Sequence, residues 1–159
     1  MSSNIVQIKR FAVHDGDGIN TAVDTCGFVP KSAIDRVIPY TDTFLYDIKA
    51  IDDEVHIKCT GQSNEIILDN LIYLDNCGAK IEISIPYIPN YNDNQINKIG
   101  KFLSKIKNVI GACVLPYHNY AKSKYAALGM EDTLPQNLPS DEEISKAKDI
   151  LKNYGISIK

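Results

Sequence analysis

Phe44-Leu45-Tyr46-Asp47-Ile48-Lys49 is the stretch that decides the fold, and it predicts a short buried strand that ends in two charged residues. Side chains alternate along a strand, so Asp47 and Lys49 are expected to face the same way. In a parallel α/β sheet, polar ligands bind at the carboxyl ends of the strands. The pair therefore indicates either a ligand site or a simple salt bridge that closes the strand end, because structural ion pairs also gather charges.

Strands and helices alternate on both sides of this stretch. The apolar patterns predict strands at residues 5–13, 21–26, 43–49, 80–86 and 109–115, a short helical turn at 52–58, and helices at 31–40, 65–76, 94–107 and 140–154. Repeated strand–helix–strand units are typical of a parallel sheet. Three or four parallel strands are too few to close an eight-stranded barrel, so we predict an α/β fold with an open parallel sheet of βα units.

Three local details of these elements are testable. The run at residues 80–88 is apolar enough for a strand buried on both faces, and Pro86 is expected to end it because proline cannot donate to a ladder. Ser63 or Asn64 is the expected N-cap of the helix at 65–76. Ser140, followed by three acidic residues, is the expected N-cap of the last helix.

The composition is that of an ordinary soluble globular domain. The chain has 159 residues, of which 44% are hydrophobic and 23% charged, with a net charge of -3. This charge gives no electrostatic case for nucleic acid or anionic lipid as a partner. No window approaches the roughly 20 apolar residues of a membrane span, and the N-terminus lacks a signal-peptide pattern, so we expect a cytoplasmic protein without a membrane partner.

The four cysteines are scattered along the chain without a short C-x-x-C spacing: Cys26, Cys59, Cys77 and Cys113. Such spacing argues against a disulfide framework and against a local metal knuckle. Reduced thiols in the core or at a site are the default expectation.

The ends of four successive predicted strands carry polar residues: Asp24-Thr25-Cys26, Asp47 with Lys49, Ser84, and His118. Because parallel strands end at one edge of a sheet, these groups are expected to share a rim suited to a small zwitterion. Its carboxylates would face an amine or a cation, and Lys49 and His118 would face a carboxylate or hydroxyl. Taken singly, His118 is compatible with a structural hydrogen-bond donor and Cys26 with a buried apolar residue. The rim has no redox centre and no nucleophile–base pair, so by itself it names no reaction.

Several segments together carry a family resemblance. They are residues 23–29 (Val-Asp-Thr-Cys-Gly-Phe-Val), 45–49 (Leu-Tyr-Asp-Ile-Lys), 60–64 (Thr-Gly-Gln-Ser-Asn), 85–89 (Ile-Pro-Tyr-Ile-Pro), 115–118 (Leu-Pro-Tyr-His), 124–129 (Lys-Tyr-Ala-Ala-Leu-Gly) and the N-terminal run 8–19. In this order they resemble the radical S-adenosylmethionine enzymes that activate glycyl radical enzymes, such as pyruvate formate-lyase activase. The resemblance implies the later part of a partial (β/α)6 barrel. Residues 1–19 would form an N-terminal strand and glycine-rich turn, and 20–159 the C-terminal βα units of one truncated domain.

One departure from the family pattern lies between the glycine-rich turn and the next strand. The family has a C-x-x-x-C-x-x-C loop that holds a [4Fe–4S] cluster and a Gly-Gly-Glu segment that helps bind S-adenosylmethionine, whereas here Gly18-Ile19 runs straight into Asn20-Thr21. Relatives carry a Gly-Ile-x-Thr segment in both contexts, so an in-frame loss between two such copies explains the join. Without three thiolates this chain is not expected to build the cluster or to cleave S-adenosylmethionine.

Site residues follow from the resemblance position by position. Asp24, Thr25, the carbonyl of Leu45 and Asp47 match a monovalent-cation site beside the cofactor. Lys49 and His118, together with Asp47 and Asp24, match cofactor-binding positions, and Asp15 matches the turn that meets the partner enzyme. Ser84 stands where relatives often carry a cofactor-binding arginine, so binding of S-adenosylmethionine is expected to be weak or lost.

Two functions remain open at this point. The first is an internally deleted activating enzyme that cannot generate the radical alone. The second is a non-catalytic module that binds the glycyl radical enzyme or a nucleoside ligand. With the early βα units missing, the strand at 21–26 is expected either to become an exposed edge or to pair with the strand at 5–13, and an exposed edge would favour self-association.

Overall fold

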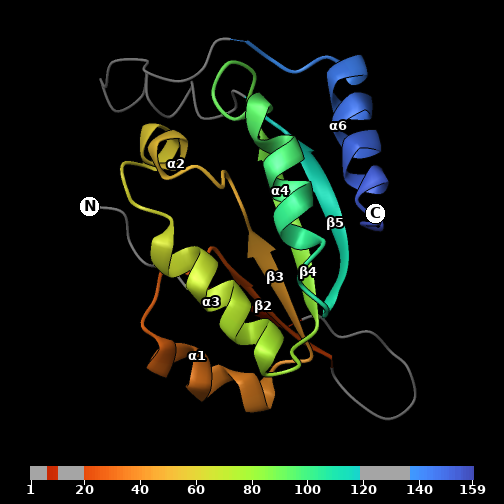
Figure 1. Cartoon of the computed structure of the whole chain (residues 1–159). Helices are drawn as coiled ribbons and strands as arrows, with labels where there is room; N and C mark the ends of the chain where they lie inside the picture. Colours follow the sequence, from red (N-terminus) through yellow and green to blue (C-terminus); the bar gives the residue numbers. More distant parts are fainter. Residues whose placement is uncertain (1–6, 11–19, 119–136) are drawn as a thin grey trace.

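The computed structural model describes residues 7–10, 20–118 and 137–159. Its sheet has the order β1-β2-β3-β4-β5, so neighbouring strands are also consecutive along the chain (Figure 1). The strands are β1 (Gln7–Arg10), β2 (Thr21–Thr25), β3 (Thr43–Asp47), β4 (Ile81–Tyr87) and β5 (Val109–Pro116). β2 to β5 are parallel, and β1 pairs antiparallel with β2. The open parallel sheet predicted from the sequence is therefore confirmed.

The helices connect these strands or follow the last of them. They are α1 (Lys31–Val37), which continues as the 3-10 helix η1 (Ile38–Tyr40), α2 (Asp53–Thr60), α3 (Glu65–Asn76), α4 (Ile96–Leu103), which follows the 3-10 helix η2 (Asp93–Gln95), and α6 (Asp141–Asn153). The predicted helix at 94–107 is too long at its C-terminal end, because Lys105 and Ile106 make turn-type hydrogen bonds to Phe102 and Leu103. None of the helices in these ranges is long and apolar enough to cross a bilayer.

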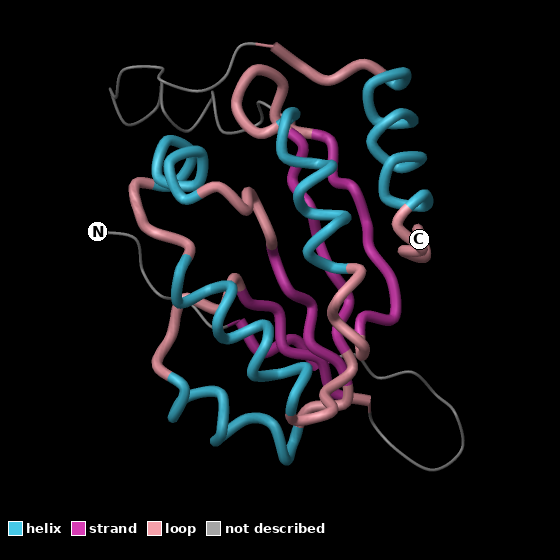
Figure 2. Tube along the Cα trace, in the orientation of Figure 1, coloured by secondary structure: helices cyan, strands magenta, loops and turns pink. Residues whose placement is uncertain are grey.

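Within the described residues, the helices that pack on the sheet all lie on one side of it. Strands that follow one another in chain order with right-handed crossovers place every connecting helix on the same face. Figures 1 and 2 show α3 and α4 in front of the strands, with α1 beside α3 and α6 beside α4, whereas α2 lies beyond the carboxyl end of β3. The sheet therefore has a helix face, and an open face that none of the described helices covers.

Burial along β4 separates these two faces. Ile81, Ile83 and Ile85 are fully buried on the helix face. The residues between them are half-buried on the open face: Glu82, Ser84 and Pro86. The prediction that this strand is buried on both faces is therefore wrong, because a sheet wound in one direction receives helices on one side only.

The open face is formed by alternate residues of the parallel strands. It comprises Ala22, Asp24, Leu45, Asp47, Glu82, Ser84 and Cys113, which alternate with the buried core residues. The helix face holds the core, including Val23, Phe44, Tyr46, Ile83, Leu71, Ile99 and Leu151. Charged and polar groups thus gather on one face of the sheet, and aliphatic and aromatic groups on the other.

Pro86 does not end β4, contrary to the sequence-based expectation. Pro86 pairs with Leu115, and the pairing continues to Tyr87 opposite Pro116. The Ser84 carbonyl accepts a hydrogen bond from the N–H of Ile48, directly after β3, so the backbone groups of residues 84 and 86 point toward β3. In a parallel ladder these groups alternate between the two neighbours. The missing N–H of Pro86 therefore weakens the β3 side and leaves the pairing with β5 intact.

Both edges of the parallel sheet have a further partner. β1 pairs with β2 over four residue pairs, from Gln7 opposite Asp24 to Arg10 opposite Thr21, which confirms the second of the two expectations for this strand. At the other edge, Ala112 of β5 forms a parallel bridge with Ile158. Self-association through a sheet edge remains a prediction. It cannot use β2 as an exposed edge strand, because β1 pairs with β2.

Candidate ligand site at the carboxyl end of the sheet

Asp47 and Lys49 form an ion pair at the point where β3 ends. The Lys49 Nζ donates to the Asp47 Oδ2 at 2.5 Å, and the side chains are 28% and 27% exposed. The expectation that the two side chains face the same way is confirmed. The salt bridge, which was one of the two interpretations of this pair, is also present. Because both groups keep about a quarter of their surface exposed, a polar ligand can reach a carboxylate and an ammonium at one place.

Asp24, Leu45 and Ser84 lie around this pair on the open face. Asp24 of β2 is the register partner of Leu45 on β3, and Asp47 is the register partner of Ser84 on β4. Asp24 and Asp47 are thus diagonal neighbours on adjacent strands, at Cα positions about 7–8 Å apart. Asp24 and Asp47 therefore lie near Leu45 on the open face, and the cation site at these residues stays a prediction.

Thr25 differs from the other residues of that predicted cation site. Its side chain is on the helix face, where the Thr25 Oγ1 accepts from the Gly27 N–H at 2.9 Å. It also lines a cavity of about 270 Å³ between β2 and α1, together with Val29 and Ile34. The Thr25 hydroxyl is therefore not available to a cation on the open face.

His118 does not share one level with Asp47 and its register partner Ser84, contrary to the single rim predicted from the sequence. Ser84 lies inside β4, three residues before the strand ends at Tyr87 opposite Pro116. β4 and β5 therefore extend about 10 Å beyond the level of Asp47. His118 is exposed and follows Pro116 by two residues. The site near Asp47 is formed by Asp24, Leu45, Lys49 and Ser84, and His118 lies further along the sheet.

The remaining sequence-based site residues are Cys26 and Asp15. Cys26 is an exposed free thiol directly after β2, so the alternative of a buried apolar residue is wrong. Asp15, the predicted partner-docking residue, lies outside the described residues.

Gly27 and Tyr46 fix the end of β2 against β3. Gly27 has a φ of 73°, and a Cβ at this position would lie 1.6 Å from the Tyr46 hydroxyl oxygen, so only glycine fits. The Tyr46 hydroxyl donates to the Ile67 carbonyl at 2.7 Å. Burial, with a smaller contribution from Cys26, raises the pKa of Tyr46 well above its ordinary value, so this phenol stays protonated. It serves as a structural hydrogen-bond donor on the helix face.

Sequence reasoning missed the role of four buried amide side chains: Asn64, Asn70, Asn92 and Gln95. Asn64 is the N-cap residue of α3, one of the two expected positions, but its side chain makes no capping bond and donates instead to the carbonyls of Ala50 and Ile51. For Asn64, Asn92 and Gln95 the only signal in the sequence was a position in or near a turn, and Asn70, in the middle of α3, gave no signal. The acceptors of Asn64, Asn70 and Asn92 include carbonyls far away in the chain, which no local pattern reveals.

An open sheet of parallel strands, with helices on one face and a polar site on the other, defines a partial α/β barrel. The Radical SAM superfamily matches residues 2–103, and the chain belongs to this superfamily. A domain of pyruvate-formate lyase-activating enzyme from Bacteroides vulgatus has a similar structure, with a TM-score of 0.72 and 27% identity over 89% of this chain and 80% of that one. The partial radical SAM barrel implied by the resemblance is thereby confirmed.

Curated relatives are activating enzymes of glycyl radical enzymes. The trans-4-hydroxy-L-proline dehydratase activating enzyme of Clostridioides difficile is 37% identical over 146 residues, which are 89% of this chain and 48% of the relative. The pyruvate formate-lyase 1-activating enzyme of Escherichia coli is 34% identical over 144 residues, 87% of this chain and 58% of the relative. The choline trimethylamine-lyase activating enzyme of Oleidesulfovibrio alaskensis is 33% identical over 147 residues, which are 89% of this chain and 47% of the relative. The chain spans about half the length of these relatives.

The four thiols do not fit the [4Fe–4S] cluster that the superfamily implies. Cys26 follows β2, Cys59 is in α2, Cys77 caps α3 and Cys113 is in β5. Within residues 7–10, 20–118 and 137–159, no three His, Cys, Asp or Glu side chains are grouped so that they could hold a metal ion. A site-differentiated cluster needs three thiolates at one place, and these thiols come from four separate elements.

Proposed function

We propose that this chain is the later part of a glycyl-radical-enzyme activating enzyme, in a single truncated cytoplasmic domain, and that it does not generate a radical by itself. The observation that carries the proposal is the direct pairing of β1 with β2, in which Arg10 is opposite Thr21. Residues 11–20 are the whole connection between these strands, and they contain no cysteine. The cluster loop of the relatives has no counterpart there.

The chemistry of the parent family explains what this loss removes. In these enzymes the cluster supplies the electron that cleaves the sulfonium of S-adenosylmethionine, and the resulting 5′-deoxyadenosyl radical takes a hydrogen atom from a glycine of the partner enzyme. This chain offers no thiolate trio, so we assign it no catalytic residue. What it retains is the polar site beside Asp47 and Lys49.

This retained site is proposed to bind S-adenosylmethionine weakly. Asp47, Asp24, Lys49 and His118 are the proposed contacts, and the carbonyl of Leu45 with Asp24, Thr25 and Asp47 is the proposed monovalent-cation site. Since the Thr25 side chain lies on the helix face, Thr25 would contribute its backbone only. Without cluster iron to chelate the amino and carboxylate groups of the ligand, we expect millimolar affinity, about −4 kcal/mol.

The proposed partner is a glycyl radical enzyme, since all three relatives named above are activating enzymes. A second candidate function is a non-catalytic module that binds this partner or a nucleoside. The Asp47–Lys49 pair favours this second function too, because the pair could bind a polar ligand without any cluster.

Anaerobic reconstitution with iron and sulfide tests the proposed loss of activity. We expect no stoichiometric [4Fe–4S] cluster and no 5′-deoxyadenosine after addition of dithionite and S-adenosylmethionine. The pyruvate formate-lyase 1-activating enzyme of Escherichia coli, treated in parallel, is the positive control. A stoichiometric cluster with 5′-deoxyadenosine formed by this chain would overturn the proposal.

Calorimetric titration with S-adenosylmethionine tests the proposed binding site. We expect an affinity no better than millimolar in the wild-type chain and a further loss in Asp47→Ala. Micromolar affinity that disappears in Asp47→Ala would show that the retained residues bind the cofactor well without the cluster. Sequencing of the source locus decides the origin of the join, since an intact reading frame with the cluster cysteines would contradict a deletion in the gene.

A further inference from the structure

The pairing between β3 and β4 stops directly before Lys49. The Ile48 N–H donates to the Ser84 carbonyl at 2.9 Å, which is the last bond between these two strands. A regular parallel ladder would continue with a bond from the N–H of residue 86 to the Ile48 carbonyl. Pro86 has no N–H, so this bond cannot form. The chain from Lys49 onward must therefore be held by something other than the sheet.

The Asn92 side chain connects the two chain segments beyond the point where the β3–β4 hydrogen bonds stop. Its Nδ2 donates to the Lys49 carbonyl at 2.7 Å and to the Pro86 carbonyl at 2.6 Å. Its Oδ1 accepts from the Ile88 N–H at 2.8 Å. The Asn92 amide thus connects the end of β3 to β4 and the turn after it. Its side chain is fully buried, where an amide is tolerated only with such partners.

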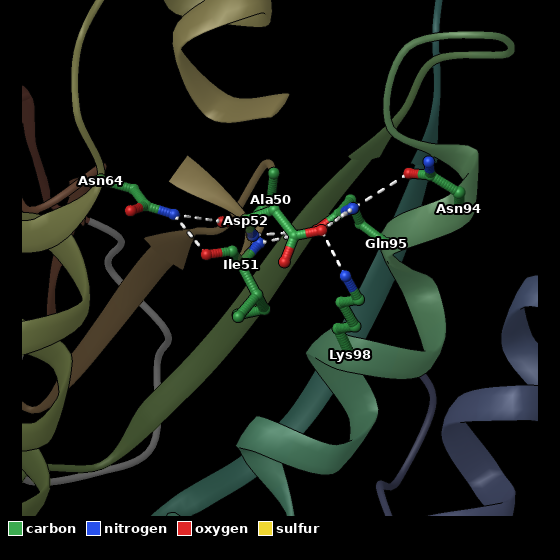
Figure 3. A network of polar contacts seen from close by, with 7 residues as sticks. All are labelled: Ala50, Ile51, Asp52, Asn64, Asn94, Gln95 and Lys98. Atoms are coloured by element: carbon green, nitrogen blue, oxygen red, sulfur yellow. Dashed lines mark hydrogen bonds and ion pairs between the residues drawn. The ribbon is translucent and has the colours of Figure 1, made fainter. Parts of the chain in front are cut away.

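Two further buried amides hold the next three residues of the same loop, as Figure 3 shows. Asn64 Nδ2 donates to the carbonyls of Ala50 and Ile51 at 3.0 and 2.9 Å. Gln95 Oε1 accepts from the N–H groups of Ile51 and Asp52 at 3.2 and 3.0 Å. Gln95 also donates to the Asp52 carboxylate, which forms an ion pair with Lys98.

The three amides come from different parts of the chain and converge on residues 49–52. Asn64 lies directly before α3, Asn92 directly before η2, and Gln95 is the last residue of η2. Together they bind a backbone group in each of the four consecutive residues that follow Ile48. A surface loop needs far fewer buried partners than this. The arrangement indicates that the position of Lys49 relative to Asp47 is fixed before any ligand arrives.

We infer that Asn92, assisted by Asn64 and Gln95, is the positioning residue of the ligand site: it holds the Lys49 backbone so that the ammonium stays on Asp47 and faces the ligand. Pro86 creates the need for this residue, because it ends the β3–β4 ladder at Ile48. The role of Asn92 in ligand binding rests on the proposed function. Its role in placing Lys49 stands on the contacts alone.

NMR of the lysine ammonium groups tests the positioning directly. A partly buried ion pair slows exchange of ammonium protons, so we expect an observable Lys49 signal in the wild-type chain, assigned by its loss in Lys49→Arg. In Asn92→Ala we expect this signal to disappear and the affinity for S-adenosylmethionine, titrated in the same samples, to fall at least ten-fold. A double variant with Pro86→Ala restores an N–H at residue 86, and we expect it to recover part of the signal.

Asn108→Ala is the matched control. The Asn108 Nδ2 also donates to a backbone carbonyl, that of Asp75 at 2.9 Å, but directly before β5, at the amino end of the parallel strands. This variant should keep both the Lys49 signal and the wild-type affinity. If Asn92→Ala does not fold, Gln95→Ala releases residues 51–52 alone and should weaken both readouts less.

Three results would separate the possibilities. An unchanged Lys49 signal in folded Asn92→Ala, or an equal loss in Asn108→Ala, overturns the positioning role. A wild-type chain with no response to S-adenosylmethionine contradicts the proposed ligand, and the ammonium signal then still decides the positioning role. The positioning role is confirmed if Asn92→Ala alone loses the Lys49 signal and the affinity, and if adding Pro86→Ala restores part of the signal.

Discussion

The two faces of β4 differ in what their residues do, although they alternate along a single strand. Ile81, Ile83 and Ile85 point to the helix face and are fully buried. Glu82 and Ser84 point to the open face, are half-buried, and lie beside Asp47 and the other polar groups. The helix face therefore supplies stability, and the open face carries the polar groups of the proposed ligand site. Substitutions on the two faces should therefore have separable effects.

The largest expected difference is between Ile83→Ala and Ser84→Ala. Ile83→Ala removes a fully buried side chain and leaves a cavity, so we expect the free energy of unfolding to fall by about 2–5 kcal/mol. Ser84→Ala, its neighbour on the open face, should change it by less than about 0.5 kcal/mol. Urea denaturation measures both. Equal losses would mean that the open face is packed like a core.

A smaller loss is expected when one hydrogen bond is removed on the helix face. Tyr46→Phe keeps the buried ring but deletes the hydroxyl that donates to the Ile67 carbonyl, and this should cost about 1–2 kcal/mol of unfolding free energy. Tyr40→Phe is the control, because Tyr40 is 79% exposed and should be neutral. A neutral Tyr46→Phe would show that the helix face is stabilised by apolar burial alone.

On the open face, the ion pair between Lys159 and Glu82 should contribute still less to the free energy of unfolding. Lys159 Nζ lies 2.6 Å from Glu82 Oε2, with side chains 48% and 23% exposed, so solvent screens the pair. Lys159→Met should lower the free energy of unfolding by at most about 1 kcal/mol. The loss should shrink when the denaturation is repeated at high salt. A larger, salt-independent loss would show that Lys159 contributes more than a screened ion pair.

The smallest effect is expected on the outer surface of the helix layer, at Tyr73. Its hydroxyl donates to Asp35 at 2.5 Å, and this bond, with a smaller contribution from Cys77, raises the pKa of Tyr73 to about 12. Because the folded chain holds this proton more tightly than the unfolded chain, the stabilisation is complete below pH 10.0 and is lost as the pH rises to about 12.

Ultraviolet titration of Asp35→Ala checks the Tyr73 prediction. Removal of the acceptor should bring the pKa of Tyr73 down toward its ordinary value of 10.0. Asp149→Ala, which removes an exposed carboxylate on α6, is the control and should leave the tyrosine titration unchanged. Identical titration curves for the wild-type chain and Asp35→Ala would show that the bond between α1 and α3 is absent in solution.

The sequence by itself predicted those features that depend on near neighbours in the chain. The alternation along β3 put Asp47 and Lys49 on one side, and the structure confirms it. The last helix begins at Ser140 with a capping box, in which Ser140 and Glu143 bond to each other's backbone N–H. Both patterns span two or three residues, so strand and helix periodicity is enough to reveal them.

Only the tertiary structure decided which face of the sheet is open and what holds the site. The apolar run of β4 did not show that helices would cover one face, because that depends on the winding of the whole sheet. Nor did the sequence show that Asn92 would bind the carbonyl of Lys49, 43 residues away. A buried amide satisfies its hydrogen bonds with whatever backbone the fold brings near, and a local pattern carries no record of that partner.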